Sequence, residues 1–244
     1  MIEIRHTGEG GLRAAYDEFY ESRQTRHEDD YYRWLIRLLR PQAGRSLLDV
    51  ACGEGPLVRT AAAAGLCARG VDLSRTALAK AGKNRGEESF VQAEGERLPF
   101  ANGTFDYVTS IGSLEHYENP DRGAAELKRV LAPGGRALIL LPNTFGLYWT
   151  IKHAWRTGEI FDDGQPIQRY GTRKEWERLL AGQGLATDEV LGFDVPARPQ
   201  SLKSWIHCLL RPWGWPRLIF VWMMIPINLA GCLVYLCTHA ENQE

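Results

Sequence analysis

The sequence lacks the cysteine and histidine spacings that are typical of disulfide frameworks and metal sites. Its five cysteines include no CxxC pair, and none of its six histidines lies four residues from a second metal-ligating side chain. A disulfide framework and a structural zinc site are therefore disfavoured, and we expect no bound metal. Residues 1–11, MIEIRHTGEGG, also lack the apolar core of a secretory signal. We expect a cytoplasmic protein with reduced thiols.

An excess of charge of one sign is also missing. Lys and Arg together number 29 against 30 for Asp and Glu, which gives a formal net charge of -1. Proteins that bind nucleic acid without sequence preference neutralise phosphates with many cations. The balanced charge therefore disfavours nucleic acid as a partner. What the chain does have is 44% hydrophobic residues over 244 positions, which suits one domain spanning residues 1–244.

Short apolar runs alternate with helical segments between residues 44 and 142. The runs that indicate strands cover 46–51, 66–73, 89–94, 104–110 and 137–142. They are continuous rather than alternating in polarity, which is typical of strands buried on both faces. Strands that alternate with helices favour a parallel sheet with helices on both sides. The sequence therefore predicts an α/β fold whose core is the segment 44–142.

Local signals predict where several elements begin and end. Pro56 and Gly65 suit the first position and the stop of one helix. Asn119 followed by Pro120 suits the start of another helix. The sequence APGGR at 132–136 predicts a turn that precedes the fifth strand.

Segments of a different kind flank this core. Residues 1–40 are expected to form a helical lid, because apolar side chains recur there at helical spacing. After residue 142 the alternation stops and aromatic residues become frequent, so we expect substrate caps over 143–175 and 196–230. Within and between these caps, TRKE at 172–175 predicts a capping box, and 186–195 predicts a sixth strand.

The stretch LLDVACGEG, residues 47–55, runs from a predicted strand through an acid into a glycine-rich turn. In an open α/β sheet, ligands bind at the carboxyl ends of the strands, and glycines there let the backbone approach a ligand. Asp72 ends the second strand, where it could accept both ribose hydroxyls of a nucleoside. A dinucleotide site needs a third glycine, where this chain has Val58. The pattern indicates a nucleoside cofactor and disfavours a dinucleotide oxidoreductase.

Five segments, in this order and spacing, together resemble a known family. They are LLDVACGEG (47–55), GVDLS (70–74), AEGERLPFANGTFDYVTS (93–110), SLEHYENP (113–120) and LAPGGR (131–136). Over roughly residues 30–142 the chain is similar to class I S-adenosylmethionine-dependent methyltransferases, in the subfamily of small-molecule and quinone methyltransferases. The resemblance implies S-adenosyl-L-methionine as cofactor and S-adenosyl-L-homocysteine as product. It also implies a Rossmann-like, seven-stranded, mostly parallel sheet with an antiparallel last strand, for which residues 232–239 are the apolar run that remains.

The resemblance further implies roles for residues around the cofactor. Residues 49–55 would wrap its methionine end, Asp72 would bind its ribose, and Leu73 would pack on its adenine. Glu94 stands where family members usually have Asp for the adenine amino group. The remaining positions are two lid tyrosines and the residues that flank the methyl group after the fourth strand. The full expected set is Tyr16, Tyr20, Asp49, Ala51, Cys52, Gly53, Gly55, Asp72, Leu73, Glu94, Gly95, Glu96, Ser110, Ile111 and Gly112.

His116 follows the fourth strand, on the loop nearest the expected methyl group. Methyl transfer is an in-line displacement, so alignment of the acceptor atom supplies much of the acceleration. A hydroxyl or enol acceptor must also lose a proton, which a histidine with a pKa of about 6.5 could take. We expect His116 to be the general base, the alternative being a loop histidine that only packs. Expected substrate contacts are Tyr117, Tyr148, His153 and Tyr170.

Residues 218–237 carry no formal charge over about the length of a membrane span. Pro226 and Gly231 interrupt this run, and its end is needed as the last strand. A hydrophobic insertion followed by a strand is therefore favoured over a transmembrane helix. Residues 200–225 place tryptophans beside basic residues, which predicts peripheral contact with an anionic membrane at its inner face, an ordinary lid being the alternative. The basic residues are Lys203, Arg211 and Arg217.

Two functions of different classes fit this pattern. The first is methyl transfer from S-adenosylmethionine to a small, hydrophobic or lipid-linked acceptor. The second is a non-catalytic S-adenosylmethionine-binding partner or regulatory module. A closed aromatic cavity beside the methyl position favours the enzyme, and a filled or open one favours the binding module. The sequence leaves open the methylated atom, whether oxygen, nitrogen or carbon, and the oligomeric state.

Overall fold

The computed structural model describes residues 1–6, 11–22, 29–82, 89–193 and 226–240. The segment 200–225, for which membrane contact is predicted, lies outside these residues. So does most of the predicted cap 196–230.

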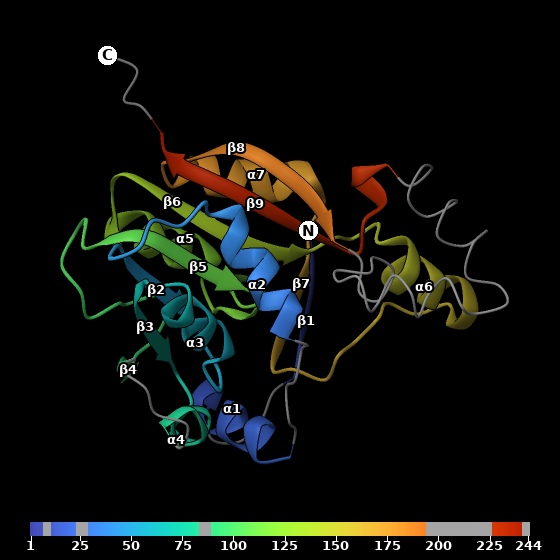
Figure 1. Ribbon diagram of the computed structural model, residues 1–244. Coiled ribbons are helices and arrows are strands. Elements are labelled where there is room, and N and C mark those ends of the chain that lie inside the picture. Colours follow the sequence, from blue (N-terminus) through green and yellow to red (C-terminus); the bar gives the residue numbers. More distant parts are fainter. Residues whose placement is uncertain (7–10, 23–28, 83–88, 194–225, 241–244) are drawn as a thin grey trace, which may run out of the picture.

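A mixed sheet of seven strands forms the centre of the molecule, in the order β4-β3-β2-β5-β6-β9-β8 (Figure 1). Every pairing from β4 to β6 is parallel, whereas β9 is antiparallel to both of its neighbours. The predicted Rossmann-like sheet with an antiparallel last strand is thus confirmed. Its strands are β2 (Ser46–Val50), β3 (Cys67–Asp72), β4 (Ser89–Gln92), β5 (Phe105–Ile111), β6 (Leu131–Pro142), β8 (Leu185–Phe193) and β9 (Cys232–His239).

The segment APGGR at 132–136, predicted as a turn, lies within β6. Leu131 pairs with Phe105 and Arg136 pairs with Tyr107, so residues 132–135 bulge outward between the two pairs. Gly134 has a φ of +74°, a conformation that glycine adopts without a steric penalty. The prediction was wrong because a bulge and a turn use the same residues.

Helices cover both faces of the sheet. One apolar cluster packs α5 (Pro120–Val130) and α7 (Arg173–Gly182) against one face. A second packs α2 (Asp29–Leu38) and α3 (Pro56–Ala63) against the other. The predicted ends are present: Asn119 caps α5 by accepting from the Arg122 N–H at 3.1 Å, and the capping box of residues 172–175 begins α7.

The predicted helical lid, residues 1–40, contains a strand and two helices. β1 (Ile2–Arg5) precedes α1 (Gly11–Ser22), and α2 follows. β1 pairs in antiparallel register with β7 (Ile167–Tyr170), which lies in the predicted cap 143–175, and the two form a separate small sheet. The sequence did not predict either strand, because β1 is short and β7 buries polar Gln168 and Arg169.

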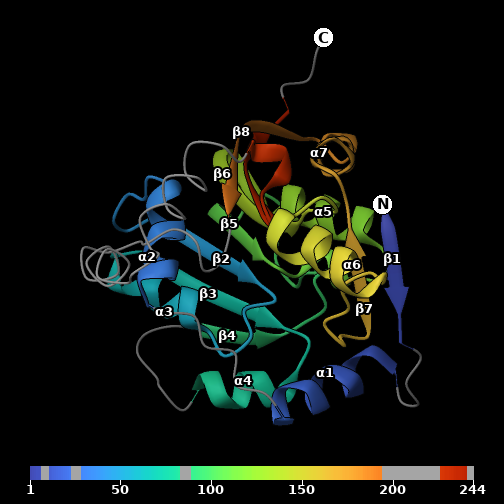
Figure 2. The same cartoon turned by 90° about the vertical axis from the view of Figure 1, so that its right-hand side faces the viewer.

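The remaining helices and turns lie around the sheet. α1 lies beside α4 (Arg75–Ala81), as Figure 2 shows. The 3₁₀ turn η2 (Leu114–His116) follows β5. A π-helical turn, η3 (Leu147–Ile151), leads into α6 (Lys152–Thr157), which lies at the side of the molecule, and the 3₁₀ turn η4 (Ile227–Leu229) precedes β9. Among the described helices, none combines the length and hydropathy that a membrane crossing requires.

Candidate functional site

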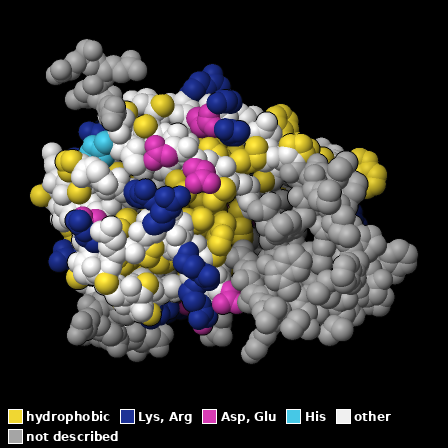
Figure 3. Space-filling model, turned by 45° about the horizontal axis from the view of Figure 1, so that its top comes forward, with side chains coloured by type: hydrophobic (Ala, Val, Ile, Leu, Met, Phe, Trp, Pro, Cys, Tyr) yellow, Lys and Arg dark blue, Asp and Glu magenta, His cyan; other side chains and the backbone are white. Residues whose placement is uncertain are grey.

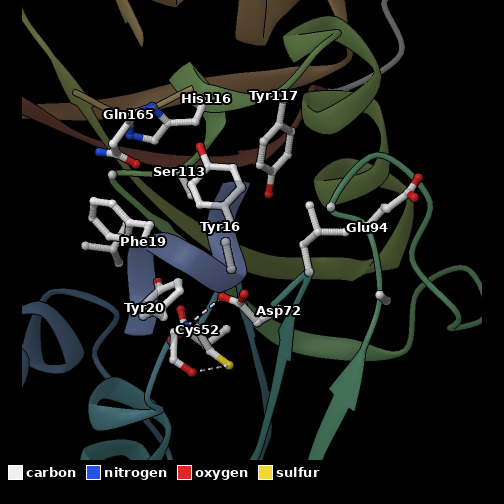
Figure 4. Close-up of a pocket in the computed structure, with 18 of the residues that line it drawn as sticks. Tyr16, Phe19, Tyr20, Cys52, Asp72, Glu94, Ser113, His116, Tyr117 and Gln165 are labelled. Carbon is white, nitrogen blue, oxygen red and sulfur yellow. Dashed lines mark hydrogen bonds between the residues drawn. The ribbon is translucent and has the colours of Figure 1, made fainter. Parts of the chain in front are cut away.

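A cavity of about 1270 Å³ opens at the carboxyl ends of β2, β3 and β5. Parallel strands end at the same edge of a sheet, so the residues that follow them meet there. α1 forms part of the wall with Tyr16, Phe19 and Tyr20, and Figure 4 shows these side chains directed toward the strand ends. The cavity thus lies between the sheet and the N-terminal lid helix.

The glycine-rich turn after β2 approaches both the lid and β4 closely. Gly53 has a φ of +55°, and a Cβ there would lie 2.8 Å from the Tyr20 hydroxyl oxygen. Gly55 has a φ of +75°, and a Cβ there would lie 2.6 Å from the Phe90 ring. Both the backbone conformation and the space therefore require glycine at these positions. α3 begins directly after the turn, so its first N–H groups lie beside the turn.

Asp72, at the end of β3, fastens this turn. One carboxylate oxygen accepts from the Gly53 N–H at 2.8 Å and the other from the Ser74 N–H at 2.8 Å. Burial raises the pKa of Asp72 to about 6, against the effect of these two backbone hydrogen bonds. Each oxygen keeps a second lone pair, so Asp72 lines the cavity with acceptor capacity left for a ligand.

Asp49, in β2, is a second buried acid at the same place. Its Oδ1 accepts from the Thr109 hydroxyl at 2.7 Å, and burial raises its pKa to about 7. Among the ion pairs of the described residues, none includes Asp49 or Asp72. Two desolvated carboxylates without a cationic partner favour a ligand that carries positive charge. We call this region, with residues 49–55 and Asp72, the acid end of the cavity.

His116 lies at the opposite end of the cavity, in η2. Its Nδ1 is 2.5 Å from the Ile167 carbonyl oxygen, which can only accept, so Nδ1 carries the proton and Nε2 is free to accept one. Burial lowers the pKa of His116, which keeps the imidazole neutral near pH 7. The nearest carboxylate is Glu115, with its Oε1 at 3.7 Å from Nε2.

Other polar side chains gather around this imidazole. Figure 4 shows Tyr16 of α1, Ser113, Tyr117 and Gln165 on the same side of the cavity as His116. The Tyr16 hydroxyl is buried and, within the described part of the chain, has no hydrogen-bond partner. Such a group is costly to leave unpaired, so it indicates a place for a ligand atom. We call this region the histidine end; its residues are Tyr16, Ser113, His116, Tyr117 and Gln165.

The structure brings most of the predicted site residues together. Those that line the cavity are Tyr16, Tyr20, Asp49, Ala51, Cys52, Gly53, Asp72, Leu73, Glu94, Gly95, Glu96, Ile111, Gly112, His116 and Tyr117. Glu94 is exposed, and Figure 4 shows its carboxylate pointing away from Asp72 and Tyr117. Its position is at the rim of the cavity.

Other predicted residues do not line the cavity. Gly55, at the end of the turn, faces the Phe90 ring, and Ser110 is fully buried with its hydroxyl 2.7 Å from that of Ser113. His153 of α6 packs against Phe161, and Tyr170 is buried in β7. The Tyr148 side chain is outside what the structure describes.

Several cavity residues were not predicted from the sequence. Among them are Phe19, Tyr31, Tyr32, Ser113, Gln165 and Phe193. Phe19 shares a helical face with Tyr16 and Tyr20, a spacing that could have identified it. Tyr31 packs on Phe193 with ring centroids 5.1 Å apart. The two residues are far apart in sequence, and no motif links them. These aromatic rings make one wall of the cavity apolar.

Comparison with known proteins places the chain among methyltransferases. The family model described as "Methyltransferase domain" matches residues 48–139. An uncharacterized protein of Methanocaldococcus jannaschii is 30% identical over an alignment of 216 residues, and the match covers 80% of this chain and 84% of that protein. A demethylmenaquinone methyltransferase of Renibacterium salmoninarum is 34% identical over 110 residues, 44% of this chain and 46% of that enzyme. The alignment thus spans less than half the length of this second relative.

A solved structure is similar in fold over most of the chain. It is the complex between the Haloferax volcanii Trm112 methyltransferase activator and a protein described as the putative methyltransferase. The match covers 96% of this chain and 100% of that chain, with a TM-score of 0.67 and 17% identity. At this identity the likeness concerns the fold alone.

Proposed function

Because the chain belongs to the class I S-adenosylmethionine-dependent methyltransferases, we propose that it transfers the methyl group of S-adenosylmethionine to a small hydrophobic acceptor. The observation that carries this proposal is the extent of the cavity, which reaches from Asp72 to the buried His116. Its volume of about 1270 Å³ exceeds the roughly 300–1,000 Å³ of common small-molecule sites. There is room for an acceptor beside the cofactor.

The residues at the acid end fit the cofactor. S-adenosylmethionine supplies a methyl group on a positively charged sulfur, and desolvated carboxylates attract such a ligand. Asp72 would accept the ribose hydroxyls with its remaining lone pairs, while Asp49 and the glycine-rich turn would hold the methionine part. Leu73 would pack on adenine, with residues 94–96 at the outer edge. α1 would cover the bound molecule with Tyr16 and Tyr20.

The residues at the histidine end fit an acceptor that must lose a proton. His116 Nε2 would take the proton from a hydroxyl or enol, and the resulting oxygen or carbon nucleophile would attack the methyl carbon in line. The Tyr16 hydroxyl would donate to the acceptor oxygen, and Tyr117 would contact its ring. Burial keeps His116 unprotonated near pH 7, which a general base requires.

Apolar and aromatic side chains in the cavity wall favour an apolar acceptor. Ile111, Leu140 and Phe193 line the cavity together with Tyr31. The related demethylmenaquinone methyltransferase, by its name, acts on a quinone, and the reduced form of a quinone carries ring hydroxyls. We infer the same class of acceptor for this chain, an apolar molecule that carries an ionisable ring hydroxyl.

A lipid-linked acceptor would bring the protein to the inner face of a membrane. In the described part of the chain, α6 supports this idea: Trp155 is 85% exposed and lies between exposed Lys152 and Arg156. Exposed tryptophan beside basic residues is typical of interfacial segments. Figure 3 shows positive and negative side chains interspersed on the face that it displays. An attraction to an anionic membrane would therefore come from a local group of basic residues and not from the charge of the whole surface. Flotation with anionic vesicles at low and high salt tests this contact, and Trp155→Ala should reduce it.

The decisive experiment is a substrate screen with the purified protein, scored by release of S-adenosylhomocysteine. We expect release with apolar acceptors that carry a ring hydroxyl, and none with the corresponding methyl ethers. Calorimetry on the same sample establishes cofactor binding independently. Binding of S-adenosylmethionine without any release, across oxygen, nitrogen and carbon acceptors, would support the non-catalytic binding module instead.

A further inference from the structure

The small sheet of β1 and β7 lies directly against the turn that carries His116. Neither strand belongs to the seven-stranded sheet, and β7 lines no part of the cavity. Its contacts with η2 are nevertheless specific hydrogen bonds rather than apolar packing alone. This small sheet therefore has a structural task that the fold of the main sheet does not explain.

Arg169 of β7 makes most of these bonds. Its side chain is only 4% exposed, and its guanidinium donates to the carbonyl oxygens of Glu115 at 3.2 Å, of Tyr117, and of Glu118 at 3.3 Å. Two residues earlier on the same strand, the Ile167 carbonyl accepts from His116 Nδ1. The backbone on both sides of His116 and its imidazole ring are thus tied to one strand.

Glu3 of β1 supplies the negative charge that Arg169 needs. The two residues face each other across the β1–β7 pairing, and Arg169 Nε donates to Glu3 Oε2 at 2.7 Å. A buried cation without a partner is costly, and the planar guanidinium can serve a carboxylate and several carbonyls at once. Lysine could not make this set of bonds, because its ammonium is a point charge with a different geometry.

We propose that Arg169, held by Glu3, is a positioning residue that orients His116 in the cavity and selects the tautomer whose Nε2 accepts a proton. This proposal rests on the proposed role of His116 as the base. The Ile167 carbonyl acts on the ring itself, because only a protonated Nδ1 can donate to it. Arg169 acts through the backbone, because its three carbonyl contacts fix where η2 presents the ring to that carbonyl.

The charged and titratable groups around His116 make the proposal measurable. They are Glu115 on its own turn, Asp163 on the segment before β7, Arg169 on β7 and the phenol of Tyr16 on α1. The Arg169 cation lowers the pKa of His116, whereas Asp163 raises it. Removing the cation should therefore raise this pKa. Losing the backbone contacts should let the imidazole populate both neutral tautomers.

The test is nitrogen NMR of the full chain labelled with ¹⁵N-histidine, with His116→Gln used to assign the signals. In the wild type we expect Nε2 to be the unprotonated nitrogen. Arg169→Gln should move the titration midpoint of His116 upward and produce a mixture of tautomers. Arg169→Lys keeps the positive charge but loses the planar guanidinium that bonds several carbonyls. It should therefore also give a mixture of tautomers, with a smaller change in the His116 titration midpoint.

The matched control is Arg173→Gln, which removes an arginine that is paired with Glu177 on the surface of α7. It should leave the His116 signals unchanged. A folded Arg169→Gln protein with the wild-type midpoint and tautomer would overturn the proposal. Should that variant fail to fold, a wild-type tautomer in Arg169→Lys would overturn it equally.

These readouts need neither acceptor nor turnover, so the two proposals can fail separately. Full turnover by His116→Gln would refute the base role, even where the Arg169 variants shift the His116 signals as expected. Unchanged signals in those variants would refute the positioning role, whatever the loss of turnover in His116→Gln.

Discussion

The acid end and the histidine end of the cavity are held in place by different means. At the acid end, Asp72 accepts from the backbone N–H groups of Gly53 and Ser74, so main-chain atoms of nearby segments fix the geometry. At the histidine end, the Ile167 carbonyl accepts from His116 and Arg169 donates to the carbonyls of the residues beside it, both from a strand about fifty residues away in sequence. One end depends on a local motif and the other on long-range side-chain contacts.

This difference has a functional consequence. A binding site made from backbone groups tolerates changes in side chains and suits a ligand that all members of a family share. A site made from side chains on separate segments changes with any of those segments, which suits a ligand that differs between members. The acid end is therefore expected to set cofactor binding, and the histidine end to set the acceptor and the proton transfer.

The largest effect should come from His116→Ala, assayed with the acceptor found by the release screen. Turnover should fall by about 10²–10⁴-fold, the usual contribution of a general base, while affinity for S-adenosylmethionine stays within twofold. Because the pKa of His116 is lowered, wild-type turnover should decline only below about pH 6.5. That acid limb should vanish in the variant. A loss below about threefold would mean that alignment alone drives the reaction.

Glu115→Gln probes the same end through stability. Burial raises the pKa of Glu115 from 4.5 to about 8, so the folded chain keeps this proton while the unfolded chain releases it. The stability of the wild type should therefore fall, relative to the variant, as the pH rises from about 4.5 to 8. The difference in unfolding free energy should reach about 3–5 kcal/mol, at 1.36 kcal/mol per pH unit.

Urea unfolding of both proteins at several pH values measures this difference. The exposed Glu118, on the same loop, provides the control, since Glu118→Gln should leave the pH dependence as it is in the wild type. Parallel curves for wild type and Glu115→Gln between pH 4 and 8 would show that Glu115 is ionised in the folded chain.

The sequence predicted the acid end of the cavity better than the histidine end. Its apolar runs predicted the strands of the main sheet, and residues 49–55 and Asp72 lie together because strand ends of a parallel sheet meet. β7 could not be predicted, since its sequence IQRY buries Gln168 and Arg169, which are usually exposed. Phe193 and Gln165 reach the cavity through tertiary packing that no local pattern encodes.

A third prediction addresses the acid end. Asp72→Ala should weaken binding of S-adenosylmethionine by about 1.5–3 kcal/mol, the range for hydrogen bonds to a charged group, or about 10–150-fold. The affinity of Asp72→Asn should lie between those of the wild type and Asp72→Ala. Its oxygen can still accept a hydrogen bond, but its NH₂ group cannot accept from the Gly53 or Ser74 N–H. Calorimetry measures both affinities.

Asp106→Asn is the matched control for this experiment. Asp106 is a hydrogen-bonded acid too, but it lies at the opposite end of β5, where it accepts from Ser46 and Arg45. Its loss should affect stability and leave cofactor affinity unchanged. If Asp72→Ala binds the cofactor as tightly as the wild type, Asp72 does not bind the ribose.

The smallest effect should come from the lid helix, which contacts both ends. Asp17 of α1 accepts from the Ser74 hydroxyl at 2.6 Å and from the Thr76 N–H at 3.1 Å, so it fastens α1 to the start of α4. Asp17→Asn should weaken these bonds by about 0.5–1.5 kcal/mol and raise the dissociation constant of the cofactor about 2–10-fold. Glu18→Gln, an exposed neighbour on the same helix, should leave cofactor affinity unchanged.

Because Tyr16 on α1 lies at the histidine end, turnover of Asp17→Asn at saturating cofactor tells whether the lid acts on one end of the cavity or on both. Unchanged turnover beside weakened binding would assign the lid to the acid end, whereas a parallel loss of turnover would show that α1 couples the two ends.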